Sequence, residues 1–213
     1  MKKLLILCVA LMATVSLSAQ NSRVATVSLA GQELRWGPTG GINCAWMNVS
    51  GNSSDCYLGF NAGVKVEYDM SRYIADGFLL DARLLYNLKG GRWASVHQNL
   101  GYLQLPVNFT YRHDLGDDFK VFAGLGPYFS LGVVGKDVEK IDGTKVKRDL
   151  FGDTYNRFDF GLNYNIGVEM WNTWQFFVGF EHSFINITKG TFWGENDYNV
   201  KPLNLYIGTA FMF

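Results

Sequence analysis

This sequence has few prolines, no net charge and few long apolar runs. Its 213 residues include only 4 prolines, and 19 basic residues balance 19 acidic residues, so the formal net charge is zero. A neutral chain without basic runs does not attract phosphate backbones, and we predict no nucleic-acid partner. Aromatic residues reach 15% and there are 24 glycines. This composition excludes disorder and fits poorly with a soluble helical bundle, which favours Ala, Leu, Glu and Lys.

The first nineteen residues have the pattern of a secretory signal peptide. Lys2 and Lys3 precede an apolar run over residues 4–15, and small residues follow up to Ala19. A spanning helix needs about 20 apolar residues, so this run is too short to be one. We predict a signal peptide over residues 1–19 and one domain over residues 20–213.

Hydrophobicity in the rest of the chain alternates with a period of two. Large apolar residues at even positions of 58–68 alternate with glycine and polar residues at odd positions. Such alternation is typical of β-strands and is not explained by helical spacing. It recurs in eight segments, most of them long enough to cross a membrane: 40–47, 57–68, 77–87, 101–113, 119–132, 157–170, 174–186 and 202–213.

The connections between these segments alternate between long and short. The long ones are 48–56, 88–100, 133–156 and 187–201, and the short ones are 69–76, 114–118 and 171–173. Outer-membrane barrels have long external loops and short periplasmic turns in this order. We predict an all-β fold, an eight-stranded antiparallel up-and-down transmembrane β-barrel. Asp142-Gly143 predicts a hairpin within the longest loop.

The two faces of each strand indicate which side meets lipid. An eight-stranded barrel has an interior just wide enough for side chains, so the bulky apolar faces would overfill it and the glycine-rich polar faces fit. We therefore predict contact with outer-membrane lipid, in a Gram-negative bacterium. A soluble, lipocalin-like barrel is the alternative, and it needs a polar exterior. An interfacial aromatic girdle is expected at Trp46, Tyr68, Tyr86, Tyr111, Trp171 and Trp174.

The chain ends in an alternating strand that finishes on phenylalanine. Phe211 and Phe213 lie on the apolar face of this last segment. The ending resembles the carboxy-terminal signal by which the barrel assembly machinery recognises its substrates, and that machinery is a predicted partner. The alternative is an ordinary last strand that ends in Phe by chance.

Short motifs resemble those of a known family. The segments YLQLPV (102–107), GLGPY (124–128) and FDFG (158–161) resemble segments of the PorT-like outer-membrane barrels of the Bacteroidota. Gln104 stands where that family usually has Glu. The resemblance implies a small outer-membrane barrel, and most members have no established biochemical activity. One member serves secretion, so a component of an outer-membrane secretion system is an alternative function.

Charged residues on the polar faces are predicted to meet inside the barrel. An ion or proton path is one interpretation, but eight strands leave no aqueous channel. We favour a buried network of ion pairs that fills the interior. Its predicted members are Lys65, Glu67, Asp81, Arg83, Arg112, Asp159, Glu169 and Glu181.

One short motif invites an enzymatic interpretation. Glu181, His182 and Ser183 are consecutive, and outer-membrane lipid A deacylases are small barrels with a His/Ser/acid site. Adjacent strand residues point to opposite faces, so His182 and Ser183 do not meet. We predict no catalytic residue, cofactor or metal site. The predicted function is structural or interaction-based, through loops 133–156 and 187–201 and an unknown partner; a lipid-modifying enzyme is the alternative.

Three local features complete the predictions. In a hairpin centred near Ser50, Cys44 and Cys56 face each other, which predicts a disulfide; the alternative is two unpaired thiols. Pro106 lies in mid-strand, where a missing N–H predicts a β-bulge. Large aromatic residues at 102, 122 and 128 are expected in the lumen, beside the glycines of the neighbouring strands.

Overall fold

The computed structural model describes residues 27–29, 32–49, 52–93, 96–141, 144–151, 154–189 and 199–213. The predicted signal peptide, residues 1–19, lies outside the described residues. Among the described residues, no helix is long and apolar enough to cross a membrane.

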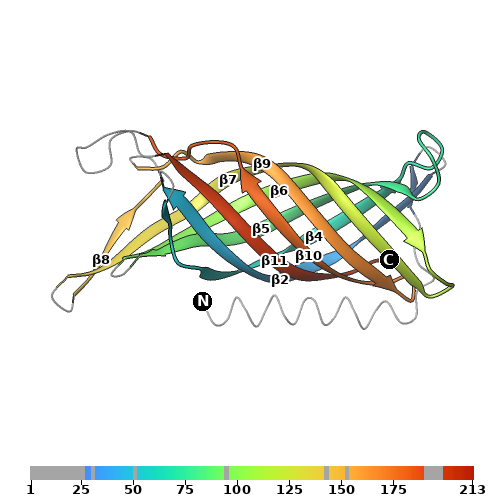
Figure 1. The fold of residues 1–213 in the computed structure, drawn as a ribbon, viewed down its shortest axis with the longest axis horizontal. Helices are drawn as coiled ribbons and strands as arrows, with labels where there is room; N and C mark the ends of the chain where they lie inside the picture. Colours follow the sequence, from blue (N-terminus) through green and yellow to red (C-terminus); the bar gives the residue numbers. More distant parts are fainter. Residues whose placement is uncertain are drawn as a thin grey trace.

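Eight antiparallel strands close into a barrel (Figure 1). They are β2 (Gln32–Val49), β4 (Tyr57–Asp69), β5 (Phe78–Trp93), β6 (Val96–Asp114), β7 (Phe119–Ile141), β9 (Phe158–Met170), β10 (Trp174–Ser183) and β11 (Val200–Phe211). Each pairs with its neighbour in the chain, and β2 pairs with both β4 and β11, which closes the barrel. The predicted eight-stranded fold is confirmed.

Three short strands are added to the barrel. β1 (Val27–Leu29) and β3 (Asn52–Ser53) pair with β2, and β8 (Thr144–Asp149) pairs with β7. The turn residues 142 and 143 of the predicted hairpin lie outside the described residues, but β7 and β8 pair up to Ile141 and Thr144 on either side of them.

One side of the barrel wall extends beyond the rest. β7 pairs with β9 only up to Leu131, opposite Phe158, and then continues for ten more residues beside β6 and β8. Residues 88–100, expected to be a loop, are mostly strand, because β5 runs to Trp93 and β6 begins at Val96. We call residues 88–93, 96–101, 132–141 and 144–149 the external sheet; it extends to the left of the barrel in Figure 1.

The short connections lie at the opposite end. The tightest joins β9 to β10, where the Thr173 N–H donates to the Met170 carbonyl. Trp171 and Asn172 both have positive φ there, 53° and 57°. A positive φ is uncommon for Trp and more common for Asn. Because short turns face the periplasm in such barrels, this end is the periplasmic one.

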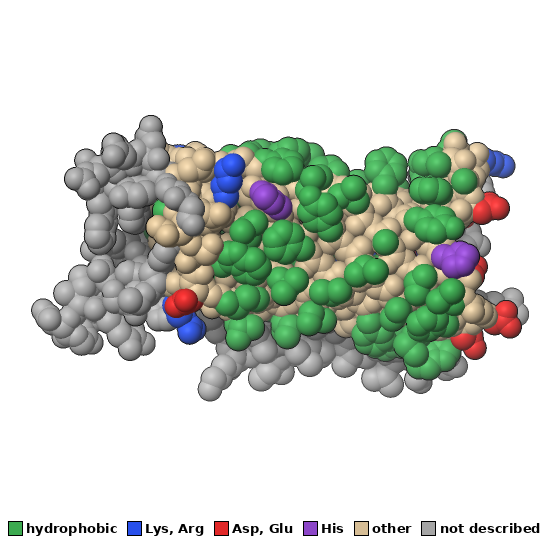
Figure 2. Space-filling view, viewed as in Figure 1, with side chains coloured by type: hydrophobic (Ala, Val, Ile, Leu, Met, Phe, Trp, Pro, Cys, Tyr) green, Lys and Arg blue, Asp and Glu red, His purple; other side chains and the backbone are tan. Residues whose placement is uncertain are grey.

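Apolar side chains cover the outside of the wall and polar ones fill the inside. Figure 2 shows hydrophobic side chains over the middle of the barrel and charged ones toward its ends. Ile42 is 61% exposed on β2, whereas its neighbour Asn43 is 2% exposed. Most of the buried charged and amide side chains face inward, together with an apolar cluster that includes Phe122 and Phe177, whereas the outward face is apolar. The outer surface of this fold therefore suits lipid and not water.

Large aromatic residues enter the lumen where glycines make room. Tyr102, Phe122 and Tyr128 are all buried. A Cβ on Gly161 would lie 2.8 Å from the Tyr128 ring, and one on Gly167 would lie 2.5 Å from the Phe122 ring. The rings therefore lie directly over backbone that carries no side chain.

The expected bulge at Pro106 is absent. β6 pairs with β5 in the same register before and after Pro106. Some residue pairs next to Pro106 are absent from the ladders with β5 and with β7. The ladder thus tolerates the missing N–H by losing pairs without inserting a residue. The register shift of β6 against β7 lies instead between Gly101 and Tyr102.

An apolar cluster lies across the external mouth of the barrel. We call it the external plug; its buried members are Met47, Leu100, Tyr102, Leu150, Phe151, Tyr155, Ile187 and Val200. Phe151 packs over Gly132 and Gly135 and makes an edge contact with Tyr102 at 5.6 Å between ring centroids. Residues from the connections thus close this end.

Candidate functional site in the barrel lumen

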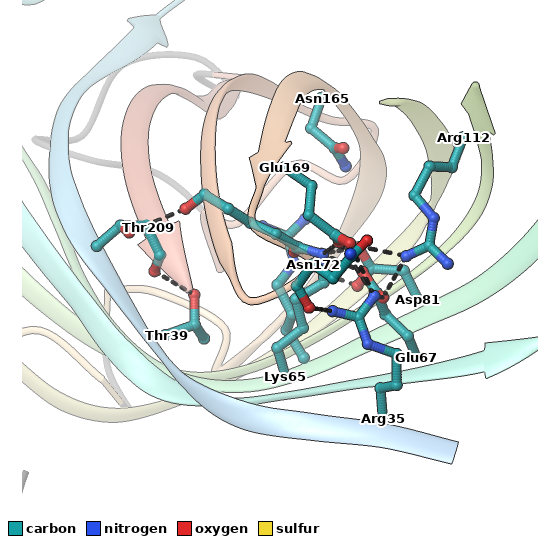
Figure 3. Close-up of polar contacts among 12 residues, drawn as sticks. Arg35, Thr39, Lys65, Glu67, Asp81, Arg112, Asn165, Glu169, Asn172 and Thr209 are labelled. Atoms are coloured by element: carbon teal, nitrogen blue, oxygen red, sulfur yellow. Dashed lines mark hydrogen bonds and ion pairs between the residues drawn. The ribbon is translucent and has the colours of Figure 1, made fainter. Parts of the chain in front are cut away.

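Two carboxylates from opposite parts of the wall meet near the periplasmic end. Glu67 projects from β4 and Glu169 from β9, and both side chains are 3% exposed or less. One guanidinium nitrogen of Arg112 lies 3.1 Å from the Glu67 carboxylate and 3.2 Å from that of Glu169. One nitrogen of Arg35 lies 3.3 Å and 3.0 Å from the same two carboxylates. Figure 3 shows the two guanidinium groups converging on the carboxylates. The arginines thus hold together two like charges that would otherwise repel.

Further charges continue this arrangement deeper in the lumen. The register places Lys65 opposite Arg83 and Glu67 opposite Asp81, so like charges face each other across β4 and β5. Directly opposed like charges are destabilising. The ion pairs run elsewhere: Lys65 lies 3.0 Å from both Glu67 and Asp81, and Arg83 lies 3.7 Å from Asp81.

Gln175 of β10 joins the two parts of this network. Its amide oxygen accepts a hydrogen bond from Lys65 at 2.6 Å. Its amide nitrogen donates to Glu67 at 2.8 Å and to Glu169 at 2.6 Å. The periplasmic ion cluster, as we call it, therefore comprises Arg35, Lys65, Glu67, Asp81, Arg83, Arg112, Glu169 and Gln175.

A second polar cluster lies on the external side. Lys89 pairs with Glu181 at 2.8 Å, and both are buried. Glu181 also accepts hydrogen bonds from the side-chain amides of Asn204, at 3.0 Å, and Gln104. Gln104 in turn accepts from Asn87 at 2.9 Å. At this position the amide serves as a donor to a carboxylate, which a Glu at residue 104 would do only when protonated.

Asp159 is buried in the lumen but is not held by an ion pair among the described residues. It accepts hydrogen bonds from Tyr128 at 3.1 Å and Ser183 at 2.5 Å. The nearby Lys89 nitrogen lies over the Tyr128 ring, 4.7 Å from its centroid. The interpretation of Asp159 as an ion-pair member is therefore corrected: hydroxyl donors satisfy this carboxylate.

Sequence reasoning missed three members of these clusters. Arg35 precedes the predicted first strand, 40–47, and Lys89 falls in the predicted connection 88–100, whereas the structure extends both strands over them. Gln175 is uncharged, so a selection of charged residues on the polar faces does not find it. The inward position of Lys89 could have been predicted, because the odd-numbered residues of this strand, Asp81, Arg83 and Asn87, all face the lumen.

When Asp159 is added to the two clusters, the charges balance. The cations are Arg35, Lys65, Arg83, Lys89 and Arg112, and the carboxylates are Glu67, Asp81, Asp159, Glu169 and Glu181. Among the described residues, the lumen thus holds five groups of each sign, joined by ion pairs and hydrogen bonds. Such an arrangement holds the wall together from the inside.

The consecutive residues Glu181, His182 and Ser183 do not form a catalytic site. His182 is exposed on the outer face, whereas Ser183 is buried in the lumen beside Asp159. A Ser/His site needs the two side chains within hydrogen-bond reach. Within the described ranges, no group of His, Cys, Asp and Glu is arranged to hold a metal ion.

Cys44 and Cys56 are joined by a disulfide, with Cα atoms 5.5 Å apart. The expected register was wrong, because Cys44 lies opposite Leu58 and not Cys56. Next to the turn, Ser54 pairs with Met47 through its N–H and its hydroxyl, both at 2.9 Å, and Asp55 then pairs with Arg92 of β5. At Asp55 the chain thus pairs with β5 in place of β2, and the disulfide links Cys56, the next residue, back to β2.

Comparisons with known proteins give a family match and several similar solved structures. A family model described as an outer membrane protein beta-barrel domain matches residues 18–189. A search of curated proteins finds no match. Solved structures of similar shape include Ail, the attachment invasion locus protein of Yersinia pestis (14% identity, 84% of this chain and 98% of that chain, TM-score 0.46). Neisserial surface protein A has 17% identity, with 84% of this chain and 97% of that chain covered and a TM-score of 0.44. OprG from Pseudomonas aeruginosa has 13% identity, with 84% and 94% covered and a TM-score of 0.42.

The assignment rests on the family match together with the closed wall of eight strands, its apolar exterior and its polar lumen. The family model covers well over half of the chain. The chain belongs to the family of the outer membrane protein beta-barrel domain, and it is an integral protein of the Gram-negative outer membrane.

Proposed function

We propose that this barrel is a non-enzymatic, pore-free outer-membrane protein that binds a partner through its external end. The external sheet carries the proposal. It consists of parts of four strands, β5 to β8, that continue beyond the last residue pair between β7 and β9. Its tip, residues 136–149, contains five basic and four acidic residues and suits water and protein surfaces better than lipid.

The lumen supports a closed barrel. Glu169, Gln104 and Gln175 are each 0% exposed, and each is held by side chains from other strands. An eight-stranded barrel filled in this way leaves no continuous water path. We expect no steady single-channel conductance in planar bilayers, and a steady conductance would refute the pore-free part of the proposal.

The partner is sought by crosslinking in intact cells followed by purification of the barrel. In the test variant, a two-residue Asn-Gly turn replaces residues 137–148, because Lys136 and Asp149 are paired and can carry a tight hairpin. The matched control alters the periplasmic turn 114–118. We expect the crosslinked partner to be lost only in the hairpin variant; retention in both would contradict the role of the external sheet.

The absence of enzymatic activity is tested separately. Mass spectrometry of lipid A from a deletion strain should show an unchanged acyl pattern, and a changed pattern would support the lipid-modifying alternative. Assignment to the PorT-like group within the family is part of the proposal, supported by the segments at 102–107, 124–128 and 158–161. A role in secretion would follow only if the crosslinked partner were a secretion component.

A further inference from the structure

A group of polar side chains in the middle of the lumen carries atoms without a hydrogen-bond partner among the described residues. Asn108 and Thr110 belong to β6, Asn165 to β9, and Asp81 and Arg83 to β5; none of them is more than 7% exposed. Nearly all buried polar atoms of folded proteins have a partner, because leaving one unpaired destabilises the fold. The described part of the chain does not supply these partners.

Thr110 and Asn165 face each other across Gly124. Gly124 pairs with Thr110 on one side and with Asn165 on the other. A Cβ at Gly124 would lie 2.5 Å from the Thr110 hydroxyl oxygen and 3.1 Å from both amide atoms of Asn165. Figure 3 shows the Asn165 side chain on the same strand as Glu169 but without a bond to the ion cluster. The two side chains therefore border the same space above the glycine and are not bonded to each other.

Asn108 borders this region from the next inward position of β6. It lies opposite Asp81 in the ladder with β5, and a Cβ at Gly126 would lie 2.7 Å from its Cα. Pairing between β6 and β7 is also interrupted at Asn108. Both amide atoms of this side chain lack a partner. The shortage is therefore the same whichever way the amide is turned.

Asp81 and Arg83 border the region from β5. Nε of Arg83 lies 3.7 Å from Oδ1 of Asp81, which is too long for a direct hydrogen bond. Both atoms are buried, and neither has another hydrogen-bond partner among the described residues. A small molecule between them and Asn108 would satisfy both.

The unpartnered atoms include donors as well as acceptors. The donors are N–H groups of Asn108 and Arg83, the acceptors are oxygens of Asn108, Asn165 and Asp81, and the Thr110 hydroxyl can do both. A metal cation would use only the acceptors and would lie close to Arg83. An anion would use only the donors and would lie close to Asp81. Water donates and accepts, so it fits the whole set.

We propose that this region, the lumen hydration site, binds a small group of ordered water molecules that bridge β5, β6 and β9 over Gly124. The waters add hydrogen bonds between strands that are not neighbours, because β7 lies between β6 and β9. The group is closed and needs no path to the external end, which is consistent with a barrel without a pore. It is independent of the external partner proposed above.

Thr110→Val tests the site because it removes the hydroxyl and keeps the shape of the side chain. We expect its unfolding constant in lipid vesicles, measured with urea and tryptophan fluorescence, to rise about five-fold, as for the loss of one hydrogen bond. The control Thr39→Val removes a buried hydroxyl that donates to the Thr209 carbonyl at 3.0 Å, and it should give a rise of similar size. Without a bound water, Thr110→Val would only remove an unpaired polar atom, so an unchanged or smaller constant would overturn the proposal.

A crystal structure of the unaltered protein, from crystals grown in rubidium bromide and at a resolution that shows ordered water, identifies the ligand directly. We expect water density within hydrogen-bond distance of the Thr110 hydroxyl and the Asn165 amide, without an anomalous signal. An anomalous peak there would show an ion in place of water, and a site without density would show that nothing is bound; either result overturns the proposal. If Thr110→Val does not fold, as judged by heat-modifiable migration, this structure still decides the question.

Discussion

The two ends of the barrel are closed by different chemistry. At the periplasmic end, strand residues build an ion cluster in which Arg35 and Arg112 bridge Glu67 and Glu169. At the external end, the plug is apolar, and Phe151 and several of its neighbours come from the connections between strands. One wall therefore carries two kinds of closure.

The difference concerns what each end tolerates. Ion pairs require each partner at a fixed distance, so the periplasmic cluster depends on strand register. Removing one partner leaves a buried charge, which is costly. An apolar plug requires mainly volume and adapts to moderate changes. We therefore expect the periplasmic end to be the more sensitive to single substitutions.

The largest effect is expected on the outer face of the periplasmic end. Phe211 packs against Trp174 and Phe213, with ring centroids 5.0 and 5.1 Å apart. Replacing both phenylalanines with Ser removes the resemblance to an assembly signal and two aromatic contacts of the closing strand. We expect the variant to remain in the periplasm and to be degraded, as judged by fractionation and heat-modifiable migration.

A matched change on the outer face in the middle of the same strand should assemble. Leu205→Ser and Ile207→Ser alter the same strand, β11, farther from its end. If they block assembly as fully as the terminal pair, the end of the chain has no special role. Normal migration of the Phe211→Ser/Phe213→Ser protein would count against it directly.

The next largest effect is expected from Glu67→Gln. This change keeps the size of the side chain but removes a charge that faces Lys65 and Arg112 at 3.0 and 3.1 Å. Leaving buried cations short of a partner costs about 3–5 kcal/mol. Urea unfolding in lipid vesicles, followed by tryptophan fluorescence, measures the change in the free energy of unfolding.

Its control is Asp114→Asn at the periplasmic rim. Asp114 is 69% exposed and lies 3.4 Å from Lys120. Exposed pairs contribute about 0–1 kcal/mol, so this variant should unfold nearly as the unaltered protein does. Equal losses from the buried and the exposed substitution would mean that burial of the cluster contributes nothing.

At the external end, Phe151→Ala should cost less than Glu67→Gln. Phe151 is 5% exposed and fills the space over Gly132 and Gly135. A buried Phe→Ala change costs about 3–5 kcal/mol in a rigid core, and we expect a value at or below the lower limit because the connections can close in. The same unfolding measurement applies, and a loss larger than that of Glu67→Gln would reverse the comparison of the two ends.

Much of the wall could be predicted because alternation fixes both strands and faces. The predicted segment 57–68 became β4 (Tyr57–Asp69), and the predicted polar face, Lys65 and Glu67 included, lies inside. The eight-stranded closure followed from the number of segments. These features depend on local pattern and on the width of a barrel, and both can be read from one sequence.

The rest depends on pairing between strands, which one sequence does not specify. The continuation of β5 to Trp93 and of β7 to Ile141 arises because the strands support one another beyond the membrane. Asp159 took hydroxyl partners because Tyr128 and Ser183 happen to reach it from neighbouring strands. The missing bulge at Pro106 shows that a ladder can lose pairs without changing register.

The smallest effect is expected from the disulfide at the external end. The bond between Cys44 and Cys56 closes a short segment, with a sequence separation of 12. Closing a loop of this length stabilises a protein by about 2–3 kcal/mol, chiefly by restricting the unfolded chain. Both cysteines belong to one hairpin that is also held by the Ser54–Met47 and Asp55–Arg92 pairs. The fold around them should therefore persist without the bond.

We accordingly expect Cys44→Ser/Cys56→Ser to assemble normally and to unfold with a loss of about 2–3 kcal/mol. The reducing agent alone should give the same loss in the unaltered protein and none in the double variant, which separates the bond from the side chains. Thiol labelling of the denatured, unreduced protein checks the starting point, since modification of both Cys44 and Cys56 would mean that no bond is present. A loss greater than that of Glu67→Gln would make the external hairpin, and not the ion cluster, the main support of the barrel.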